Sequence, residues 1–212
     1  MFALDLDGVA TRRPARPCAW RGGSNLCLGS WAMAEVRLRQ WRRSDIDDVA
    51  VMIGDEHLRP WSTMGENLEA WIEREVAESR GPTRAICLPD DDRAIGRVAV
   101  RPPELASAAV RCEAVREADQ PAGELSYWLV PQVRGRGLAY AAVRTMIRSV
   151  VPATGLRSVV LDIEAGNTPS IRLAERLGAE RRSPTRVQID RSGTPRTLVV
   201  YVLSVPTGST FR

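Results

Sequence analysis

The chain has 212 residues, 44% of them hydrophobic, which is enough for one domain of ordinary size with a sizeable core. Its 30 basic and 26 acidic residues leave a net charge of +4, and the basic residues, all of them arginine, are scattered rather than gathered in blocks. This distribution argues against a nucleic-acid-binding surface, so we expect no nucleic-acid partner.

Cysteine and histidine usage argue against a metal site. The four cysteines lack the close spacing of zinc ligands, and His57 is the only histidine. The same spacing argues against a disulfide framework and favours a reducing compartment. No apolar run is long enough to cross a bilayer, and the N-terminus lacks the basic-then-apolar order of a signal peptide. We therefore expect a cytoplasmic protein with no metal and no membrane partner.

Residues 1–33 differ in composition from the rest of the chain. They are rich in arginine, proline and glycine and show no sustained period, which predicts a poorly ordered extension. The run from Asp5 to Val9 resembles the nucleophile motif of haloacid-dehalogenase-type phosphatases. That motif requires a buried strand in a large α/β domain, which the following residues cannot supply. We therefore predict an extension over 1–33, one folded domain over 34–205 and a tail over 206–212.

The domain begins with a strand and two helices. Residues 36–40 alternate apolar and polar side chains, which predicts a half-buried strand. The run 41–48 then opens a helix, with Ser44 as its N-cap and aspartates in its first turn. A second helix is expected over 66–79, with an apolar face formed by Leu68, Trp71, Ile72 and Val76.

A hairpin and a long connection follow. Residues 84–88 and 94–101 predict two strands around the turn 89–92. We interpret the three adjacent aspartates of this turn as solvated, since nothing nearby completes a set of cation ligands. Residues 102–123 form a connection whose length is typical of a functional or disordered loop.

The stretch 125–150 changes from a strand pattern to a helix pattern. Leu125–Val130 is a short apolar run that Pro131 closes. From Leu138 onward, apolar residues recur every three or four positions, which predicts a helix with one buried face.

Two glycines stand at the join between these patterns. Gly135 and Gly137 let the chain turn tightly and leave the first amides of the helix open to a ligand. These amides and the helix dipole predict a phosphate or pyrophosphate site, to which Arg134 and Arg136 add positive charge. A Walker loop does not fit, because the chain has no lysine. A Rossmann loop does not fit either, because Tyr140 stands where its third glycine is required.

The C-terminal part predicts three strands and one helix. Residues 158–163 form an apolar strand, followed by a helix that Thr168 caps and Gly178 ends. Residues 187–189 and 197–203 predict a closing hairpin. The whole order predicts a mixed α/β sheet with helices on both faces.

The loop Gln132–Gly137 resembles the acyl-CoA signature of the GNAT superfamily of N-acyltransferases, Gln/Arg-x-x-Gly-x-Gly/Ala, and matches each specified position. The run Asn167–Ser170, with the helix that ends at Leu177–Ala179, resembles the family's other acyl-CoA motif. The Tyr-Trp-Leu-x-Pro run before the loop is similar to the branch of the RimJ/RimL-type ribosomal-protein N-acetyltransferases. The resemblance covers 36–205 and implies the GNAT fold, a central mixed, mostly antiparallel sheet flanked by helices on both faces.

The resemblance also implies which residues bind the acyl donor, acetyl-CoA. The backbone amides of Leu129 and Val130 would hold the pantetheine and polarise the thioester carbonyl. Asn167 would bond the pantetheine arm, although Asn167 and Ser170 could instead only cap the helix. The full set that the resemblance implies is Leu129, Val130, Gln132, Val133, Arg134, Gly135, Arg136, Gly137, Leu138, Ala139, Asn167 and Ser170.

Amide formation requires a base for the amine proton and a proton or dipole for the leaving thiolate. Glu124, at the start of the strand that leads into the loop, is the candidate base, and its alternative role is an exposed strand-end charge. By resemblance, Ser170 is the candidate donor to the sulfur, with Tyr127 and Tyr140 as substitutes. Ala174 stands where many family members carry a tyrosine acid.

We therefore predict an N-acetyltransferase that moves an acetyl group from acetyl-CoA to a primary amine by direct attack in a ternary complex, without a metal. The acceptor would be a protein N-terminal α-amino group or a small-molecule amine, and Trp61 could line its pocket. Three alternatives stay open: an acyl-CoA-binding module without efficient catalysis, transfer of a longer acyl group such as succinyl, and a phosphatase acting through Asp5. A homodimer is one assembly that the resemblance allows.

Overall fold

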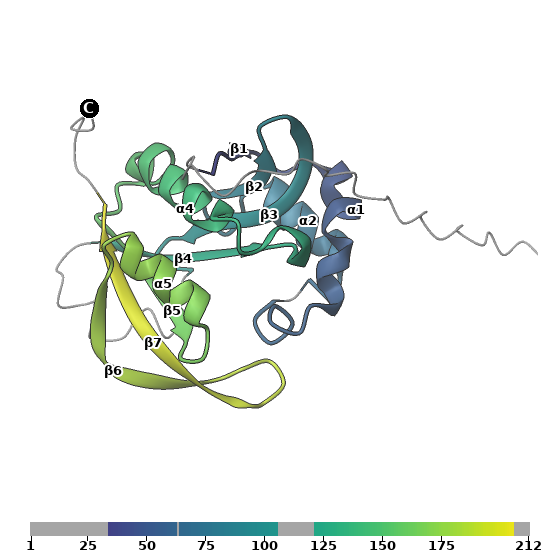
Figure 1. Ribbon diagram of the computed structural model, residues 1–212. Helices are drawn as coiled ribbons and strands as arrows, with labels where there is room; N and C mark the ends of the chain where they lie inside the picture. The colour runs from purple at the N-terminus through teal and green to yellow at the C-terminus, as the bar shows by residue number, and fades with distance from the viewer. Residues whose placement is uncertain (1–33, 63, 106–120, 206–212) are drawn as a thin grey trace, which may run out of the picture. The chain divides into compact units, whose positions relative to one another are not determined.

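The computed structural model describes residues 34–62, 64–105 and 121–205 (Figure 1). The predicted extension over 1–33, with its Asp5 motif, and the predicted tail over 206–212 lie outside the described residues. Most of the predicted connection over 102–123 does so as well. The domain boundaries therefore stay predictions.

The described residues form strands, helices and short 3₁₀ turns in the predicted order (Figure 1). The strands are β1 (Arg37–Arg39), β2 (Thr83–Leu88), β3 (Asp91–Arg101), β4 (Ala122–Leu129), β5 (Ser158–Glu164), β6 (Glu180–Ile189) and β7 (Pro195–Ser204). The α-helices are α1 (Ile46–Val49), α2 (Leu68–Val76), α4 (Leu138–Ser149) and α5 (Thr168–Arg176). The 3₁₀ turns are η1 (Arg43–Asp45), η2 (Ala50–Gly54), η3 (Pro131–Val133) and η4 (Val151–Thr154).

The strands form one seven-stranded sheet in the order β1-β2-β3-β4-β5-β7-β6. Among the described strands only β4 and β5 pair in parallel, and the other neighbours are antiparallel. This arrangement confirms the predicted mixed, mostly antiparallel sheet. The closing hairpin is longer than predicted, because β6 and β7 extend well beyond the short apolar runs that the sequence shows.

Helices cover both faces of the sheet (Figure 1). We call the face that α4 and α5 cover the front face, and the face that α1 and α2 cover the rear face. The apolar side of α4 packs on the front face through buried residues including Ala142, Val143 and Met146. On the rear face, the ring of Trp71 in α2 lies edge-on to Trp41, with centroids 5.3 Å apart, and 6.2 Å from Trp128 in β4.

Helix termini differ from the prediction in detail. Ser44 lies inside η1, and the carboxylate of Asp45 instead accepts the Arg42 amide at 2.8 Å. The cap of α5 is Asn167, one residue before the predicted Thr168. Both shifts arise because an Asp or Asn side chain accepts a backbone amide readily when it stands at the first turn.

The face of α2 also differs from the prediction. Trp71 and Ile72 are buried as expected, but Val76 is exposed and Glu75 is buried in its place. Glu75 is buried because it accepts hydrogen bonds from Thr83 and Arg97 on the sheet below it.

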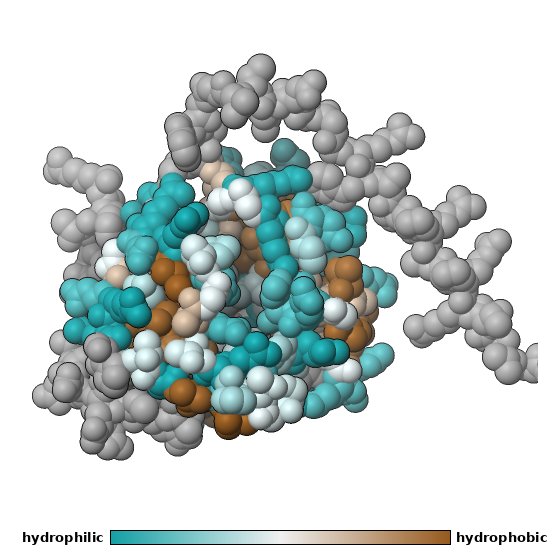
Figure 2. Space-filling view, turned by 60° about the horizontal axis from the view of Figure 1, so that its bottom comes forward, coloured by the Kyte–Doolittle hydropathy of each residue, from teal (hydrophilic) through white to brown (hydrophobic). Residues whose placement is uncertain are grey.

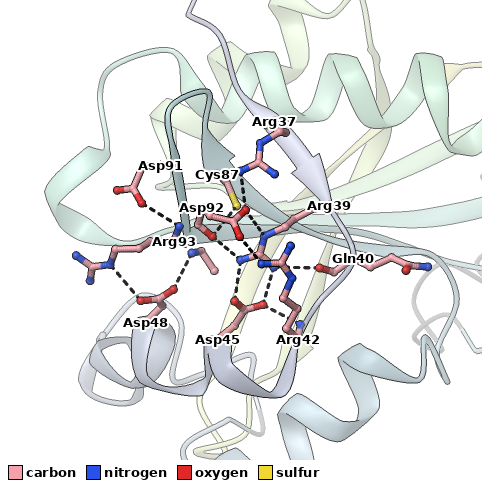
Figure 3. Close-up of polar contacts among 11 residues, drawn as sticks. Arg37, Arg39, Gln40, Arg42, Asp45, Asp48, Cys87, Asp91, Asp92 and Arg93 are labelled. Carbon is pink, nitrogen blue, oxygen red and sulfur yellow. Dashed lines mark hydrogen bonds and ion pairs between the residues drawn. The ribbon is translucent and has the colours of Figure 1, made fainter.

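A network of arginines and aspartates holds the short strand β1 in place (Figure 3). Arg39 donates to both carboxylate oxygens of Asp45, at 2.7 and 2.8 Å, and both side chains are largely buried. Asp92, the second residue of β3, pairs with Arg37 at 2.6 Å and also with Arg42. Asp92 therefore contacts arginines rather than solvent alone and serves the fold.

Candidate active site

The two central strands of the sheet separate halfway along their length. β4 and β5 pair only as far as Glu124 and Val160, although β4 continues to Leu129 and β5 to Glu164. Beyond this last pair the strands run apart (Figure 1). We call the interval between the unpaired ends of these two strands the opening.

Two hydroxyl groups meet at the front side of this opening. Alternation along β4 places Tyr127 on the front face, and Ser170 lies in the first turn of α5. Burial raises the pKa of the Tyr127 phenol above its usual range, and the neighbouring Ser170 hydroxyl acts in the opposite direction. The phenol oxygen is buried and has no hydrogen-bond partner among the residues that the structure describes. The structure thus brings these two predicted residues together and leaves a buried hydroxyl that a ligand could bond.

The predicted phosphate loop leads from β4 into α4. Gly135 and Gly137 both have φ of 76°, in the left-handed region that favours glycine, and Gly137 is the N-cap of α4. No side chain of the described residues caps this helix, so its first amides are open. Val133 and Leu138 are buried in the core and can serve a ligand only through their backbone. Open amides at the start of a twelve-residue helix fit a pyrophosphate.

Arg134 is partly exposed, at 37% of its side chain, but two contacts fix its position. Its Nη2 donates to Asp55 Oδ2 at 2.7 Å, and its Nε donates to the Leu129 carbonyl at 2.9 Å. Although burial alone would raise it, the pKa of Asp55 is lowered by Arg134 and by the amides of Leu58 and His57. Arg134 therefore ties the loop to the segment after η2, a positioning contact that the sequence does not reveal.

The prediction for the two strand-end amides is half wrong. The Val130 amide donates to the Ile95 carbonyl in β3 at 2.9 Å, so it is not free for the donor. Successive amides of a strand point to opposite edges, so the Leu129 amide points toward the opening instead. Leu129 remains a candidate donor to a thioester carbonyl.

Asn167 and Tyr140 have partners within the protein. The side-chain oxygen of Asn167 accepts the Ser170 amide at 3.2 Å, so its capping role is confirmed. The guanidinium of Arg176 lies 4.1 Å from the ring centroid of Tyr140 and links α5 to α4. Of the two tyrosines, Tyr127 is the one that lies beside Ser170.

The rear side of the opening carries carboxylates. Glu124 is only 8% exposed, and Arg101 Nη2 in β3 lies 2.5 Å from its Oε1. The alternative of an exposed strand-end charge is therefore wrong. The role of Glu124 as a base stays a prediction.

A second rear-face carboxylate, Asp162, lies on β5 just past the last β4–β5 pair. Its buried Oδ2 forms an ion pair with Arg186 of β6. Burial raises the pKa of Asp162 to about 6; the charge of Glu124 acts in the same direction, and Arg186 and Arg101 oppose it. A buried carboxyl that titrates near neutrality is typical of a functional site.

The hairpin β6–β7 reaches across the rear side. The amide of Arg191, in its turn, donates to the Pro60 carbonyl at 3.1 Å, and its guanidinium pairs with Glu66. Trp61, in the loop that the turn contacts, is 37% exposed, as an acceptor-lining role would allow. Figure 2 shows the side that carries this hairpin, with apolar groups separated by polar ones. The surface offers mixed chemistry rather than one broad apolar patch.

Sequence reasoning missed Asp55, Asp162 and Arg186, and it did not pair the predicted Arg134 with Asp55. Asp162 left one signal, a single charge inside the apolar run 159–163. Asp55 left none, because its partner stands far along the chain and only the folded structure brings them together.

Neither a metal cluster nor a membrane-spanning helix appears in the part of the chain that the structure describes. No group of three or more His, Cys, Asp or Glu side chains is placed there to hold an ion. No helix of the same residues is long and apolar enough to cross a bilayer. Cys87 is a buried free thiol in β2, and burial raises its pKa.

Comparison with solved structures shows the same fold. The acetyltransferase (GNAT family) from Bacillus anthracis is 14% identical, with a TM-score of 0.63 over 81% of this chain and 96% of that chain. Mycobacterium smegmatis RimJ in complex with CoA-disulfide is 18% identical, with a TM-score of 0.58 over 80% and 81%. The microcin C7 self-immunity acetyltransferase MccE, in complex with acetyl-CoA and AMP, is 14% identical, with a TM-score of 0.61 over 81% and 93%.

Comparison with sequences identifies the family. A search of curated protein sequences found no match. The family described as "Acetyltransferase (GNAT) domain" matches residues 35–180, which is most of the chain and includes both the phosphate loop and the Tyr127–Ser170 pair. The chain therefore belongs to the GNAT family of N-acetyltransferases, whose acyl donor is acetyl-CoA.

Proposed function

We propose that the protein transfers an acetyl group from acetyl-CoA to a primary amine, with both substrates bound at once. The opening between β4 and β5 carries this proposal, because the Tyr127 and Ser170 hydroxyls lie beside it on the front face and Glu124 and Asp162 lie beside it on the rear face. A thioester placed in the opening would face a proton donor on one side and an incoming amine on the other.

Specific groups support each requirement of the reaction. The open amides of the loop suit the pyrophosphate, and the Leu129 amide suits the thioester carbonyl. Tyr127, assisted by Ser170, would give the leaving sulfur its proton, since its phenol is buried and unbonded among the described residues.

The acceptor is proposed only by class. The RimJ/RimL-type pattern before the loop favours a protein α-amino group, and RimJ is one of the structural neighbours. Another neighbour is a chimera of a spermidine N-acetyltransferase, so small polyamines are a second class of acceptor to test. An acceptor screen should therefore contain peptides with free N-termini, polyamines and aminoglycosides, and should compare acetyl-CoA with succinyl-CoA.

Calorimetric titration of acetyl-CoA and CoA tests the donor site. The variant Gly137→Asp places a negative charge beside the proposed pyrophosphate and should abolish binding. Gly155→Asp is a matched control, because Gly155 has a similar φ of 74° and an added Cβ there would meet nothing within 4 Å.

Loss of binding by Gly137→Asp but not by Gly155→Asp supports the proposal. No binding by the folded wild type would refute it. Binding without transfer to any amine of the screen would favour the alternative of an acyl-CoA-binding module.

A further inference from the structure

The rear face of the opening carries two acidic side chains, and they are not equivalent. Glu124 belongs to the paired part of β4 and contacts Arg101 at 2.5 Å. Asp162 stands two residues beyond the last β4–β5 pair, where the strands have separated. In the parallel register it lies level with Ser126, one residue from Tyr127 along β4.

The face of the sheet on which each side chain lies decides which groups it can contact. Asp162 and Glu124 lie on the rear face, because each alternates with apolar residues that pack on the front. Tyr127 points to the front, where the phosphate loop and α5 lie. A thioester in the opening would therefore have its proton donor on the front and a carboxylate on the rear.

The surroundings of Asp162 distinguish it from a purely structural carboxylate. Its side chain is 11% exposed, and its Oδ2 forms an ion pair with Arg186 of β6. The charged groups around it are Glu124 on β4, Arg101 on β3 and Arg186 on β6. A buried carboxylate that one arginine partly balances and a second carboxylate repels can exist in both the charged and the neutral form.

We propose that the Asp162 carboxylate, directly or through one water molecule, accepts the proton that the acceptor amine must lose before it attacks. This assignment rests on the proposed acetyl transfer. The ammonium group loses one proton to Asp162, and the freed lone pair forms the C–N bond as the C–S bond breaks. Of the two protons that the nitrogen loses overall, one balances the proton that reaches sulfur, and the other leaves through Asp162 to solvent.

In this arrangement Glu124 is a positioning residue that makes Asp162 a better base. Its negative charge raises the pKa of Asp162, which burial brings to about 6, close to the range where a general base works best. Arg186 opposes this effect and keeps the carboxylate from being permanently protonated.

Three variants and one control test the assignment with an amine that the wild type acetylates. Asp162→Asn should lower kcat by about 10²- to 10⁴-fold, with the affinity for acetyl-CoA measured by calorimetry unchanged within about twofold. Asp162→Asn/Arg186→Gln removes both charges, so it keeps the test valid if the single variant folds poorly. Asp162→Glu should restore part of kcat. Asp92→Asn, an aspartate paired with arginines elsewhere on the sheet, should leave kcat and its pH dependence unchanged.

The variant Glu124→Gln distinguishes between the two carboxylates as candidate bases. If Asp162 is the base, this variant keeps most of its activity, and the acidic limb of the kcat profile moves to lower pH by about half a unit to one unit. If Glu124→Gln instead abolishes transfer while Asp162→Asn keeps it, the assignment is overturned and Glu124 is the base.

The two proposals fail in different ways. Transfer that persists in Asp162→Asn with an unchanged acidic limb overturns only the role of Asp162. Absence of acetyl-CoA binding, or of transfer to every amine tested, overturns the proposed function and this assignment with it.

Discussion

Asp92 and Asp162 both pair with arginines on the same sheet, yet their environments act on them in opposite directions. Asp92 lies at the exposed start of β3, where Arg37 and then Arg42 hold the pKa of its carboxyl at about 2 (Figure 3). Asp162 lies at the opening between β4 and β5, where burial raises its pKa to about 6. An ion pair by itself therefore does not reveal whether a carboxylate serves the fold or the chemistry.

The difference lies in what surrounds each pair. The Asp92 cluster includes Asp45, whose carboxylate accepts both arms of Arg39 and the Arg42 amide. The bonds that Asp92 accepts from Arg37 and Arg42 favour its charged form. Asp162 is buried with one ion pair, to Arg186, and its neighbour Glu124 repels its charge. Burial and Glu124 together favour the neutral form of Asp162, which Arg186 opposes.

The largest expected effect is a fall in kcat, and only substitutions at the opening should cause it. Tyr127→Phe removes the buried hydroxyl that would protonate the leaving sulfur, so kcat should fall by about 10²- to 10⁴-fold. Acetyl-CoA affinity should change little, because the loop amides are untouched. Steady-state kinetics with calorimetry checks this. A near-wild-type kcat for Tyr127→Phe that collapses only with Ser170→Ala would assign the donor role to Ser170.

The second effect is a loss of stability, and it should come from substitutions in the Asp92 cluster. Asp45→Asn removes the carboxylate that accepts both arms of the largely buried Arg39 guanidinium and leaves only the more exposed Asp92, 3.3 Å from Arg39 Nε, so the free energy of unfolding should fall by about 3 kcal/mol. Urea denaturation measures this. At a temperature where the variant is folded, its kcat should match the wild type, and a strong loss of kcat would contradict the separation of the two clusters.

The third effect is a pH dependence of stability that comes from Asp162. Because its folded pKa, about 6, lies above the reference value of 3.8, its neutral form favours the folded state, and this stabilisation is lost as pH rises through 6. The contribution to the unfolding free energy between pH 4 and pH 8 should be on the order of 3 kcal/mol. Asp162→Asn should lack this component, and an identical pH slope in both proteins would contradict it.

The smallest effect should arise at Asp55. Asp55→Asn weakens its partly exposed contact with Arg134, so the free energy of unfolding should fall by about 1 kcal/mol or less. Thermal unfolding at two salt concentrations checks this, because the difference from wild type should shrink at high salt. A difference that does not depend on salt would show that the contact is not mainly electrostatic.

Local features of the fold follow from the sequence, because they depend on neighbouring residues. The glycines at 135 and 137 and the helix after them predict the phosphate loop, and the structure places both at positive φ. The exact cap of each helix was harder to predict from the sequence, because two neighbouring side chains could each accept the same amides. Asp45 stands beside Ser44, and Asn167 stands beside Thr168.

Features that depend on distant residues could not be predicted. Arg134 stands in the family signature, but its partner Asp55 comes from a segment 79 positions away. Asp162 appears in the sequence as a charge in an apolar strand, whereas its burial depends on β6 crossing to bring Arg186 beside it. The amide of Val130 seemed available because the sequence does not show that β3 pairs with it.

The central claim is that the opening holds a carboxyl poised to take a proton, and NMR can test it directly. Protein labelled with ¹³C at the aspartate carboxyls should show one resonance that is missing from Asp162→Asn. We predict that this resonance titrates with a midpoint near pH 6 and moves to lower pH in Glu124→Gln. A midpoint below about 4, as for an ordinary exposed aspartate, would contradict the account.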